Sequence, residues 1–259
     1  MLTNIKVLAV IPARWASTRF PGKPTADILG KPMVQWVFEQ VQKSNLVNDV
    51  VVATDDKRIY DVVSDFGGNA VMTLPSHQSG TDRVAEVAKK IDCDIVVNVQ
   101  GDEPLIPPEN IDLVIKPLLT STELSVSTLM IGILNQNEMF DPNICKVVVD
   151  RKGYAMYFTR ASVPYNRDSS IVDNMGINKN VGLQILGYKH IGIYAYTKSF
   201  LLKFSKLKVS RLECPEKLEQ LRILENGYSI MVTETTLNSI GVDLPEDLVN
   251  VEAVIKSKR

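Results

Sequence analysis

The sequence predicts an α/β protein with a mixed, mostly parallel sheet that is flanked by helices. Two observations carry this prediction. In the N-terminal part of the chain, short apolar runs typical of strands buried on both faces alternate with stretches of helical spacing. After about residue 120 the pattern changes, and strand-like runs follow one another with few helices between them. Because alternating strands and helices favour parallel pairing with right-handed crossovers, the first part should form the parallel portion of the sheet.

The N-terminal elements are predicted from apolar spacing and from the residues that end them. In the stretch 33–43, apolar residues recur on one side of a helix. Gly67 suits the C-terminal end of the next helix, because glycine adopts the left-handed conformation found there. We predict strands at 6–11, 50–53, 70–72 and 94–99, and helices at 33–43, 56–66 and 82–90.

The second part of the chain is predicted to be rich in strands. The segment 151–153 (Arg-Lys-Gly) is typical of a turn between hairpin strands, Gly227 suits a helix end, and Pro245 suits the first turn of a final helix. The predicted strands are 124–131, 146–150, 154–158, 190–196 and 230–233, with a helix at 216–226 and a long polar loop at 166–180. We interpret residues 1–259 as one domain with a β-rich section within about 124–200.

The composition excludes several classes of protein. The 259 residues have a formal net charge of −1, which argues against a nucleic-acid coat or a membrane-surface protein. Cys93, Cys145 and Cys214 are widely separated and form no CxxC motif, so neither a disulfide framework nor a structural zinc site is expected. No apolar run approaches the roughly 20 residues that cross a bilayer, and no signal-peptide pattern is present. We expect a soluble cytoplasmic protein with no nucleic-acid or membrane partner.

The loop after the first predicted strand concentrates positive charge. Arg14, Arg19 and Lys23 lie within a few residues of one another, and Gly22 allows the backbone to approach a ligand closely. Ligands of parallel sheets bind at the carboxyl ends of strands, and Arg and Lys side chains suit phosphate oxygens. The loop therefore predicts a triphosphate site, and its alternative is a solvated basic loop. Neither a GxGxxG fingerprint nor a Walker loop is present.

Two aspartates are candidates for binding magnesium. Asp102 follows the strand predicted at 94–99, and Asp243 precedes the final helix. Magnesium prefers hard oxygen ligands and usually bridges a carboxylate to substrate phosphates. The alternatives are a turn aspartate for Asp102 and a helix N-cap for Asp243.

The polar loop at 76–83 opens a predicted helix. Its amides and side chains suit the edge of a nucleobase, and the alternative is a helix capped by Thr81 or Ser79. His190 begins a predicted strand, where a lone histidine is more often structural than catalytic.

These motifs, taken in order, resemble those of the 3-deoxy-D-manno-octulosonate (Kdo) cytidylyltransferases. The resemblance starts with the 11–24 loop and covers nearly the whole chain. It continues through Ala53-Thr54-Asp55, His77-Gln78-Ser79-Gly80-Thr81, the 98–104 segment, Tyr157-Phe158-Thr159-Arg160-Ala161, the 190–194 segment, the 218–222 segment and Gly241-Val242-Asp243. It implies a Rossmann-like nucleotide-diphospho-sugar transferase fold. It also implies transfer of CMP from CTP to the anomeric hydroxyl of Kdo with release of pyrophosphate, for lipopolysaccharide biosynthesis.

The resemblance also implies roles for individual residues, a Mg²⁺ cofactor and a homodimer formed through the β-rich section. The implied catalytic residues are Arg14, Lys23 and Asp102. The implied nucleotide-binding residues are Ala13, Arg14, Arg19, Lys23, His77, Gln78, Ser79, Gly80 and Arg83. The implied sugar-binding residues are Gln100, Arg160, Arg167, His190, Tyr194, Glu219 and Gln220. The implied metal ligands are Asp102 and Asp243.

Departures from the family pattern fall on the sugar side. They are a longer 168–189 stretch, Tyr165 and Asn166 in place of a Trp-Asp pair, and differences at Arg211 and Pro215. The same reaction on 8-amino-Kdo, or on another sugar acid such as sialic acid, therefore stays open. An inactive nucleotide-binding regulator is the alternative from another class, and its mark would be loss of an acid or of Lys23. The missing glycine fingerprint disfavours a nicotinamide dehydrogenase.

Overall fold

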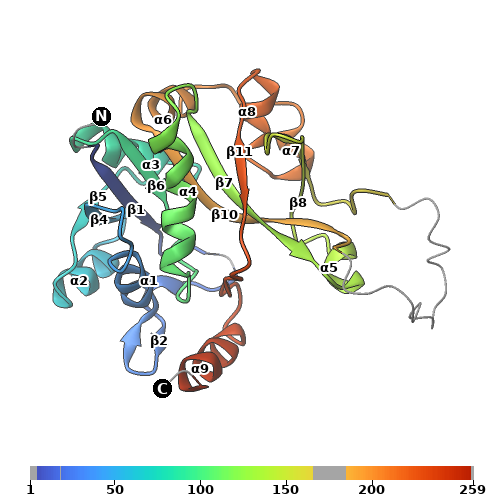
Figure 1. Ribbon diagram of the computed structural model, residues 1–259. Helices are drawn as coiled ribbons and strands as arrows, with labels where there is room; N and C mark the ends of the chain where they lie inside the picture. Colours follow the sequence, from blue (N-terminus) through green and yellow to red (C-terminus); the bar gives the residue numbers. More distant parts are fainter. Residues whose placement is uncertain (1–4, 18, 166–184, 258–259) are drawn as a thin grey trace.

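The computed structural model describes residues 5–17, 19–165 and 185–257, and its central feature is a nine-stranded sheet (Figure 1). Seven strands follow one another across the sheet in the order β11-β7-β10-β6-β1-β4-β5, and β8 and β9 extend it beside β10. The strands are β1 (Val7–Ala13), β4 (Asp49–Thr54), β5 (Ala70–Met72), β6 (Ile95–Asn98), β7 (Val126–Ile133), β8 (Lys146–Val149), β9 (Ala155–Thr159), β10 (Gly187–Thr197) and β11 (Met231–Glu234). β2 (Asp27–Ile28) and β3 (Lys31–Pro32) form a separate hairpin.

The predicted mixed, mostly parallel sheet is confirmed. The strands β6, β1, β4 and β5 pair in parallel, as do β11 and β7. β10 runs antiparallel to its neighbours β6, β7 and β8, and β8 runs antiparallel to β9. The parallel half therefore corresponds to the alternating N-terminal part of the sequence, and the antiparallel half lies in the β-rich section.

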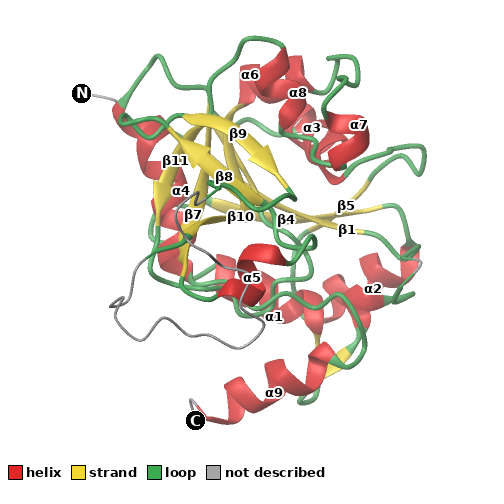
Figure 2. Cartoon of the chain, turned by 90° about the vertical axis from the view of Figure 1, so that its right-hand side faces the viewer, coloured by secondary structure: helices red, strands yellow, loops and turns green. Residues whose placement is uncertain are grey.

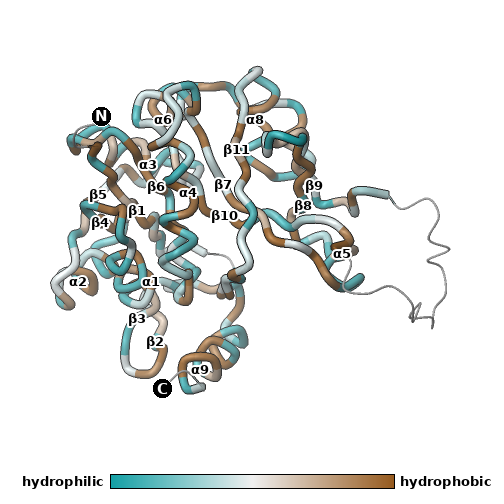
Figure 3. Tube along the Cα trace, viewed as in Figure 1, coloured by the Kyte–Doolittle hydropathy of each residue, from teal (hydrophilic) through white to brown (hydrophobic). Residues whose placement is uncertain are grey.

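Helices cover both faces of the sheet. α1 (Met33–Val41), α2 (Lys57–Asp65) and α4 (Pro108–Thr120) belong to one hydrophobic core, and α3 (Gly80–Lys90), α6 (Lys198–Phe204) and α8 (Leu221–Glu225) belong to the other. Alternate residues of β1 enter the two cores, because successive strand side chains point to opposite faces. Figure 2 shows the sheet between the two groups of helices, and Figure 3 shows apolar residues along the central strands.

The helix predicted at 216–226 is wrong. The chain forms two short helices, α7 (Glu213–Glu216) and α8, and Lys217 between them has a φ of 54° in the left-handed region. Tertiary contacts explain the break. Thr159 Oγ1 and the Arg160 N–H donate to the Glu216 carboxylate, and Arg160 Nε donates to the Glu216 carbonyl at 2.8 Å. These hydrogen bonds stabilise an end for α7 at Glu216.

Other elements differ in smaller ways from the predictions. α4 was not predicted; its buried residues recur at helical spacing, and Pro117 lies inside it. α5 (Gln136–Phe140) and α6 were not predicted either, and α9 (Asp247–Ser257) begins after Pro245 rather than at it. The loop predicted at 166–180 lies outside the described residues. In the described part of the chain, no helix combines the length and apolar character needed to span a membrane.

Candidate active site

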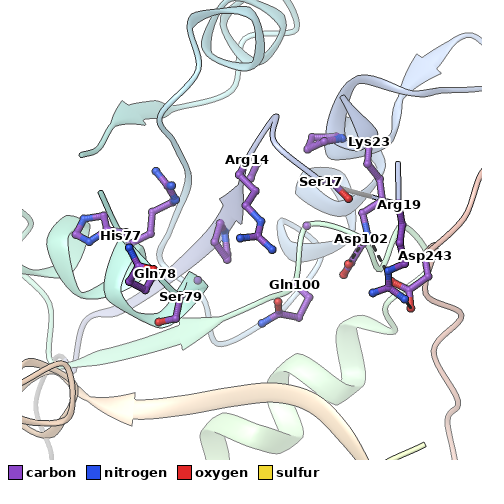
Figure 4. Close-up of a pocket in the computed structure, with 16 residues that line it drawn as sticks. Arg14, Ser17, Arg19, Lys23, His77, Gln78, Ser79, Gln100, Asp102 and Asp243 are labelled. Atoms are coloured by element: carbon purple, nitrogen blue, oxygen red, sulfur yellow. Dashed lines mark hydrogen bonds and ion pairs between the residues drawn. The ribbon is translucent and has the colours of Figure 1, made fainter. Parts of the chain in front are cut away.

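A cavity lies where β1 and β6 end and α3 begins (Figure 4). This is the edge of a parallel sheet at which ligands bind, because loops diverge there and helix N-termini point toward the opening. The cavity holds about 240 Å³. It is lined by Pro12, Ala13, Arg14, Ser17, Arg19, Lys23, Pro24, His77, Gln78, Ser79, Gly80, Arg83, Gln100, Gly101, Asp102 and Asp243.

Lys23, Asp102, Asp243 and Arg19 meet at one end of this cavity (Figure 4). Lys23 Nζ lies 2.7 Å from Asp102 Oδ2 and 3.7 Å from Asp243 Oδ1, and it donates to the Val242 carbonyl at 2.8 Å. Arg19 contacts the other Asp243 oxygen at 3.2 Å. Three segments far apart in sequence therefore place two cations and two carboxylates at one position.

The loop that carries Lys23 is held by an aromatic ring. Gly22 has a φ of 70°, in the region that favours glycine, and a Cβ there would lie 3.0 Å from the Trp15 ring. The Arg58 guanidinium lies 3.5 Å from the centre of the same ring and is paired with Asp56 at 2.7 Å. A cation over an aromatic face is attracted to it, so the start of α2 helps to hold the cationic loop.

Close backbone contact brings the Asp102 loop against β1. A Cβ on Gly101 would lie 2.8 Å from the Pro12 carbonyl oxygen, so only glycine fits there without a shift. On its other side, the Asp102 carbonyl accepts a hydrogen bond from the Val242 N–H at 2.8 Å. This second contact ties the Asp102 and Asp243 loops to each other.

The segment His77, Gln78 and Ser79 lies at the opposite end of the cavity, with Arg14 and Gln100 between the two ends (Figure 4). Ser79 is the N-cap of α3, since its side chain accepts from the Asp82 N–H. The capping interpretation and the cavity position are thus both correct for Ser79, whereas Thr81 is not the cap.

Glu86 on α3 fixes His77. Its Oε2 lies 2.7 Å from His77 Nε2 and accepts from the Leu74 N–H at 2.9 Å, and its Oε1 accepts from Lys90 Nζ. Burial opposes ionisation of this carboxyl, but the hydrogen bonds from Lys90, Leu74 and His77 outweigh it and lower the pKa of Glu86 to about 2. Because an ionised carboxylate only accepts hydrogen bonds, Nε2 of His77 carries the proton in this pair.

Arg83 is buried beside the cavity. Its guanidinium donates to Asp55 Oδ2 at 2.8 Å and to the Thr73 hydroxyl, and Asp55 directly follows β4. This pair joins α3 to the carboxyl end of a neighbouring strand.

The structure places only some of the expected sugar-binding residues at this cavity. Gln100 lines the cavity, and its amide donates to Asn98 Oδ1 at 3.2 Å. Arg167 lies outside the described residues. Five of them do not line this cavity: Arg160 directly follows β9, His190 and Tyr194 lie on β10, and Glu219 and Gln220 directly precede α8.

Contacts connect several of these residues to the cavity and to one another. Asn98, which accepts from Gln100, is the register partner of Tyr194 across β6 and β10. The rings of Tyr194 and His190 lie 5.3 Å apart. The Glu219 carboxylate accepts from Thr81 Oγ1 at 2.6 Å.

His190 is held in its neutral form. The residue is half-buried, its ring contacts those of Phe158 and Tyr194, and its Nε2 lies 2.9 Å from Thr128 Oγ1. Burial lowers the pKa of His190 to about 3, since the interior disfavours the charged imidazolium. His190 is therefore a weak proton acceptor near neutral pH. Its conformation is fixed by neighbouring residues, in agreement with the structural interpretation of its position.

Asp102 and Asp243 form a donor set that suits magnesium. Both carboxylates contact the ammonium of Lys23, so they already face one shared positive charge. Among the described residues, no group of three or more His, Cys, Asp or Glu side chains could hold a metal ion without further ligands. Mg²⁺ commonly binds one or two carboxylates and completes its shell with phosphate oxygens and water. The residues present therefore fit a metal that arrives with a polyphosphate.

Several residues around the site were not found from the sequence. Ser17 and Gly101 are close to predicted site residues in the chain, so proximity could have indicated them. Glu86, Asp55 and Arg58 act on site residues from neighbouring elements, and no sequence spacing identifies such contacts.

A charged cavity at the carboxyl ends of parallel strands is typical of nucleotide-binding α/β proteins. The sequence profile described as cytidylyltransferase matches residues 8–233. The chain belongs to this family, and within it to the 3-deoxy-manno-octulosonate cytidylyltransferases, as its relatives indicate. The relative from Syntrophotalea carbinolica is 52% identical over 97% of this chain and 99% of its own length. The relative from Geobacter metallireducens is 51% identical over 94% of this chain and 95% of its own.

Solved structures agree with this assignment. A structure of CMP:2-keto-3-deoxy-manno-octonic acid synthetase in complex with CTP superposes with a TM-score of 0.88 and 40% identity, over 98% of this chain and 100% of that one. A 4-diphosphocytidyl-2C-methyl-D-erythritol synthase from Anaerococcus prevotii, at 13% identity, has a TM-score of 0.62 over 97% of this chain and 99% of that one. The second likeness shows the fold alone.

Proposed function

We propose that this enzyme transfers CMP from CTP to the anomeric hydroxyl of Kdo and releases pyrophosphate, in the cytoplasm, for lipopolysaccharide biosynthesis. The observation that supports it most is the convergence of Lys23, Asp102 and Asp243 at one end of a cavity whose other end is formed by His77 and Ser79. Relatives about half identical over nearly the whole chain carry the name of this activity.

The cationic loop binds the triphosphate in this proposal. Arg14 is exposed and lines the cavity between its two ends, and Arg19 and Lys23 lie at the end where the carboxylates gather. Fixed positive charges near the scissile bond stabilise the charge that grows on departing pyrophosphate. His77, Gln78, Ser79, Gly80 and Arg83 would then surround the cytosine, with Ala13 at the end of β1.

Asp102 and Asp243 would hold Mg²⁺. When bound, the ion screens the phosphates and lowers the pKa of the attacking hydroxyl. The chain's own contribution is to hold the two carboxylates beside Lys23 and to orient CTP, so that the hydroxyl approaches the α-phosphorus opposite the departing pyrophosphate. No covalent intermediate with the protein is required, since phosphoryl transfer depends mainly on positioning and charge.

The sugar acid would bind beside Gln100, against the antiparallel strands. Its carboxylate gives Arg160 a function, because a guanidinium binds a carboxylate through two parallel donors. Tyr194 and His190 would form an apolar wall there, and Glu219 and Gln220 would bind hydroxyl groups.

We also propose that two chains associate through the β-rich section. Phe140 is 61% exposed and Met156 is 64% exposed, and both are large apolar side chains within this section. Sedimentation of the purified protein tests it, and a concentration-independent monomer would contradict it.

Pyrophosphate release tests the proposed activity. The purified protein is incubated with CTP and Mg²⁺, without acceptor or with Kdo, 8-amino-Kdo or sialic acid. We expect release with Kdo that stops when the metal is chelated, and a product that contains both CMP and Kdo. Turnover of another acceptor alone would correct the substrate, and no turnover with any acceptor would favour a nucleotide-binding regulator.

A further inference from the structure

Lys146, the first residue of β8, is a lysine with no exposed surface in the described structure. Its Nζ donates three hydrogen bonds of 2.8 Å, to the carbonyls of Asp141, Ile144 and Arg160. An ammonium has three N–H donors, so all of them are used. Burial lowers the pKa of this lysine from its ordinary value, and the three carbonyls compensate for the water it has lost.

Arg160 is held by the same turn of the chain. Its Nη1 donates to the carbonyls of Pro142 at 3.0 Å and Asn143 at 3.4 Å. The carbonyls of four consecutive residues, 141–144, therefore bind two cations that lie side by side. Because carbonyls that point together repel one another, the two cations stabilise this shape of the turn.

Neither cationic side chain forms an ion pair in the described part of the chain, although the backbone N–H of Arg160 donates to the Glu216 carboxylate at 2.9 Å. None of the ion pairs there includes Lys146 or Arg160. Carbonyls orient a cation without neutralising it, so the positive charge of the pair stays available to an anion. Lys189 is the register partner of Lys146 on β10 and differs in this respect, because it is paired with Glu138 at 2.6 Å.

The start of β8 also contacts other residues expected to bind the sugar acid. The carbonyl of Cys145 accepts from the His190 N–H at 2.8 Å. The sulfur of the same cysteine accepts from Gln220 Nε2 at 3.7 Å. Cys145 and Lys146 thus connect Arg160, His190 and Gln220, which come from three separate segments of the chain.

We propose that Lys146 is a positioning residue for the anionic acceptor: by binding the 141–146 turn and the Arg160 carbonyl, its ammonium holds the Arg160 guanidinium where it meets the acceptor's carboxylate. This inference rests on the proposed transfer of CMP to a sugar acid. Lys146 does not touch the acceptor itself, because all three of its N–H groups donate to backbone carbonyls.

The substitution Lys146→Met tests the proposal, because methionine fills the space of the lysine stem and removes the charge and the donors. Steady-state kinetics are measured with CTP and Kdo varied in turn, and Kdo binding is measured by calorimetry without CTP. We expect the KM and the Kd for Kdo to rise about tenfold or more, with the KM for CTP within about twofold of wild type. Lys189→Met is the matched control, and we expect its KM for Kdo to stay within about twofold.

The other possible outcomes distinguish a positioning role of Lys146 from a purely structural one. A lowered melting temperature with an unchanged KM for Kdo, or equal rises in both KM values, would make Lys146 merely structural and overturn the proposal. If Lys146→Met does not fold, Lys146→Gln removes the charge and one of the three donors but keeps two N–H donors, and the same rise in KM for Kdo is expected. Failure of both variants to fold would assign the lysine to folding alone. Absence of turnover with Kdo in the wild type would contradict the proposed function instead.

Discussion

The two sides of the proposed site differ in the groups that bind their cationic side chains. On the side proposed for the nucleotide, Lys23 is paired with Asp102 and Asp243, and Arg19 also contacts Asp243. On the side proposed for the acceptor, Lys146 and Arg160 are bound by backbone carbonyls. Both arrangements fix the cations in place, but in the second neither side chain forms an ion pair with a carboxylate of the described residues.

This difference corresponds to the ligand proposed for each side. A triphosphate carries several negative charges and brings Mg²⁺, so the carboxylates that pair with Lys23 can also bind the ion. A sugar acid carries one carboxylate and brings no cation, so a carboxylate paired with the Arg160 guanidinium would compete with it. Carbonyl oxygens orient the guanidinium without that competition. The substitutions that follow test this contrast, from the largest expected effect to the smallest.

The substitution Asp102→Asn should have the largest effect. Removal of the charge weakens the proposed metal site and the pairing with Lys23, so we expect kcat to fall at least about a hundredfold while the melting temperature changes little. Pyrophosphate release and thermal denaturation measure the two quantities. Asp92→Asn is a suitable control, because Asp92 is 85% exposed and pairs with Lys6 on the surface. Full activity of Asp102→Asn would refute the role of this residue.

The substitution Arg160→Gln should affect the KM for Kdo without affecting the KM for CTP. Loss of the guanidinium removes a charge-assisted contact with the acceptor, so we expect the KM for Kdo to rise roughly a hundredfold with little change in the KM for CTP. Kinetics with each substrate varied in turn measure this. Arg151→Gln, in the exposed turn before β9, is the control. A rise in the KM for CTP of the same size would abolish the contrast between the two sides.

The substitution Glu86→Gln should affect the nucleotide side alone. Its carboxylate holds His77 and the Leu74 N–H, so we expect the KM for CTP to rise about fivefold and the KM for Kdo to stay unchanged. Glu252→Gln removes an equivalent surface pair with Lys256 on α9 and should change neither value. If the Glu86 variant behaves like this control, His77 is not held by Glu86 for function.

The stability of the protein should depend on Glu86 in acid. Its pKa is about 2 in the folded chain and near 4.5 when unfolded, so its contribution is complete above about pH 5 and is lost as the pH falls toward 2. We expect wild type to be more stable than Glu86→Gln by up to about 2 kcal/mol at neutral pH, with a difference that shrinks below pH 4.5. Denaturant unfolding at a series of pH values measures this. A difference that is constant with pH would be inconsistent with the lowered pKa.

The substitution Arg58→Ala should have the smallest effect. An exposed cation over an aromatic ring contributes about 0.5–1 kcal/mol, so we expect the KM for CTP to rise two- to fivefold. Intrinsic tryptophan fluorescence should also change, because the Trp15 ring loses the cation above it. Lys57→Ala, beside it on α2, is the control. Wild-type affinity for CTP in the Arg58 variant would show that the loop is rigid without this contact.

Much of the nucleotide side could be predicted from the sequence. Arg14, Arg19 and Lys23 lie in one loop, and that loop follows a strand whose apolar run is plain in the sequence. Each predicted nucleotide-binding residue and both aspartates line the same cavity. The local pattern was sufficient for the cationic loop and Asp102, which follow β1 and β6, because the carboxyl ends of parallel strands lie along one edge of a sheet. The other residues were assigned to this site by the family resemblance.

The acceptor side could not be predicted in the same way. A break at Lys217 replaces the continuous helix expected at 216–226, because Glu216 bonds to Thr159 and Arg160. Nothing in the sequence distinguishes Lys146 from Lys189, although one is enclosed by carbonyls and the other is paired with a carboxylate. These outcomes depend on contacts between residues distant in the chain.

The sequence by itself determined the alternation of strands and helices, the cationic loop and the family resemblance, because each depends on residues that are neighbours along the chain. Only the tertiary structure decided which charges are paired and which are left for ligands. Pairing depends on distances of a few ångströms between segments such as β8 and the end of β9, and it is set by how the whole chain packs around the sheet.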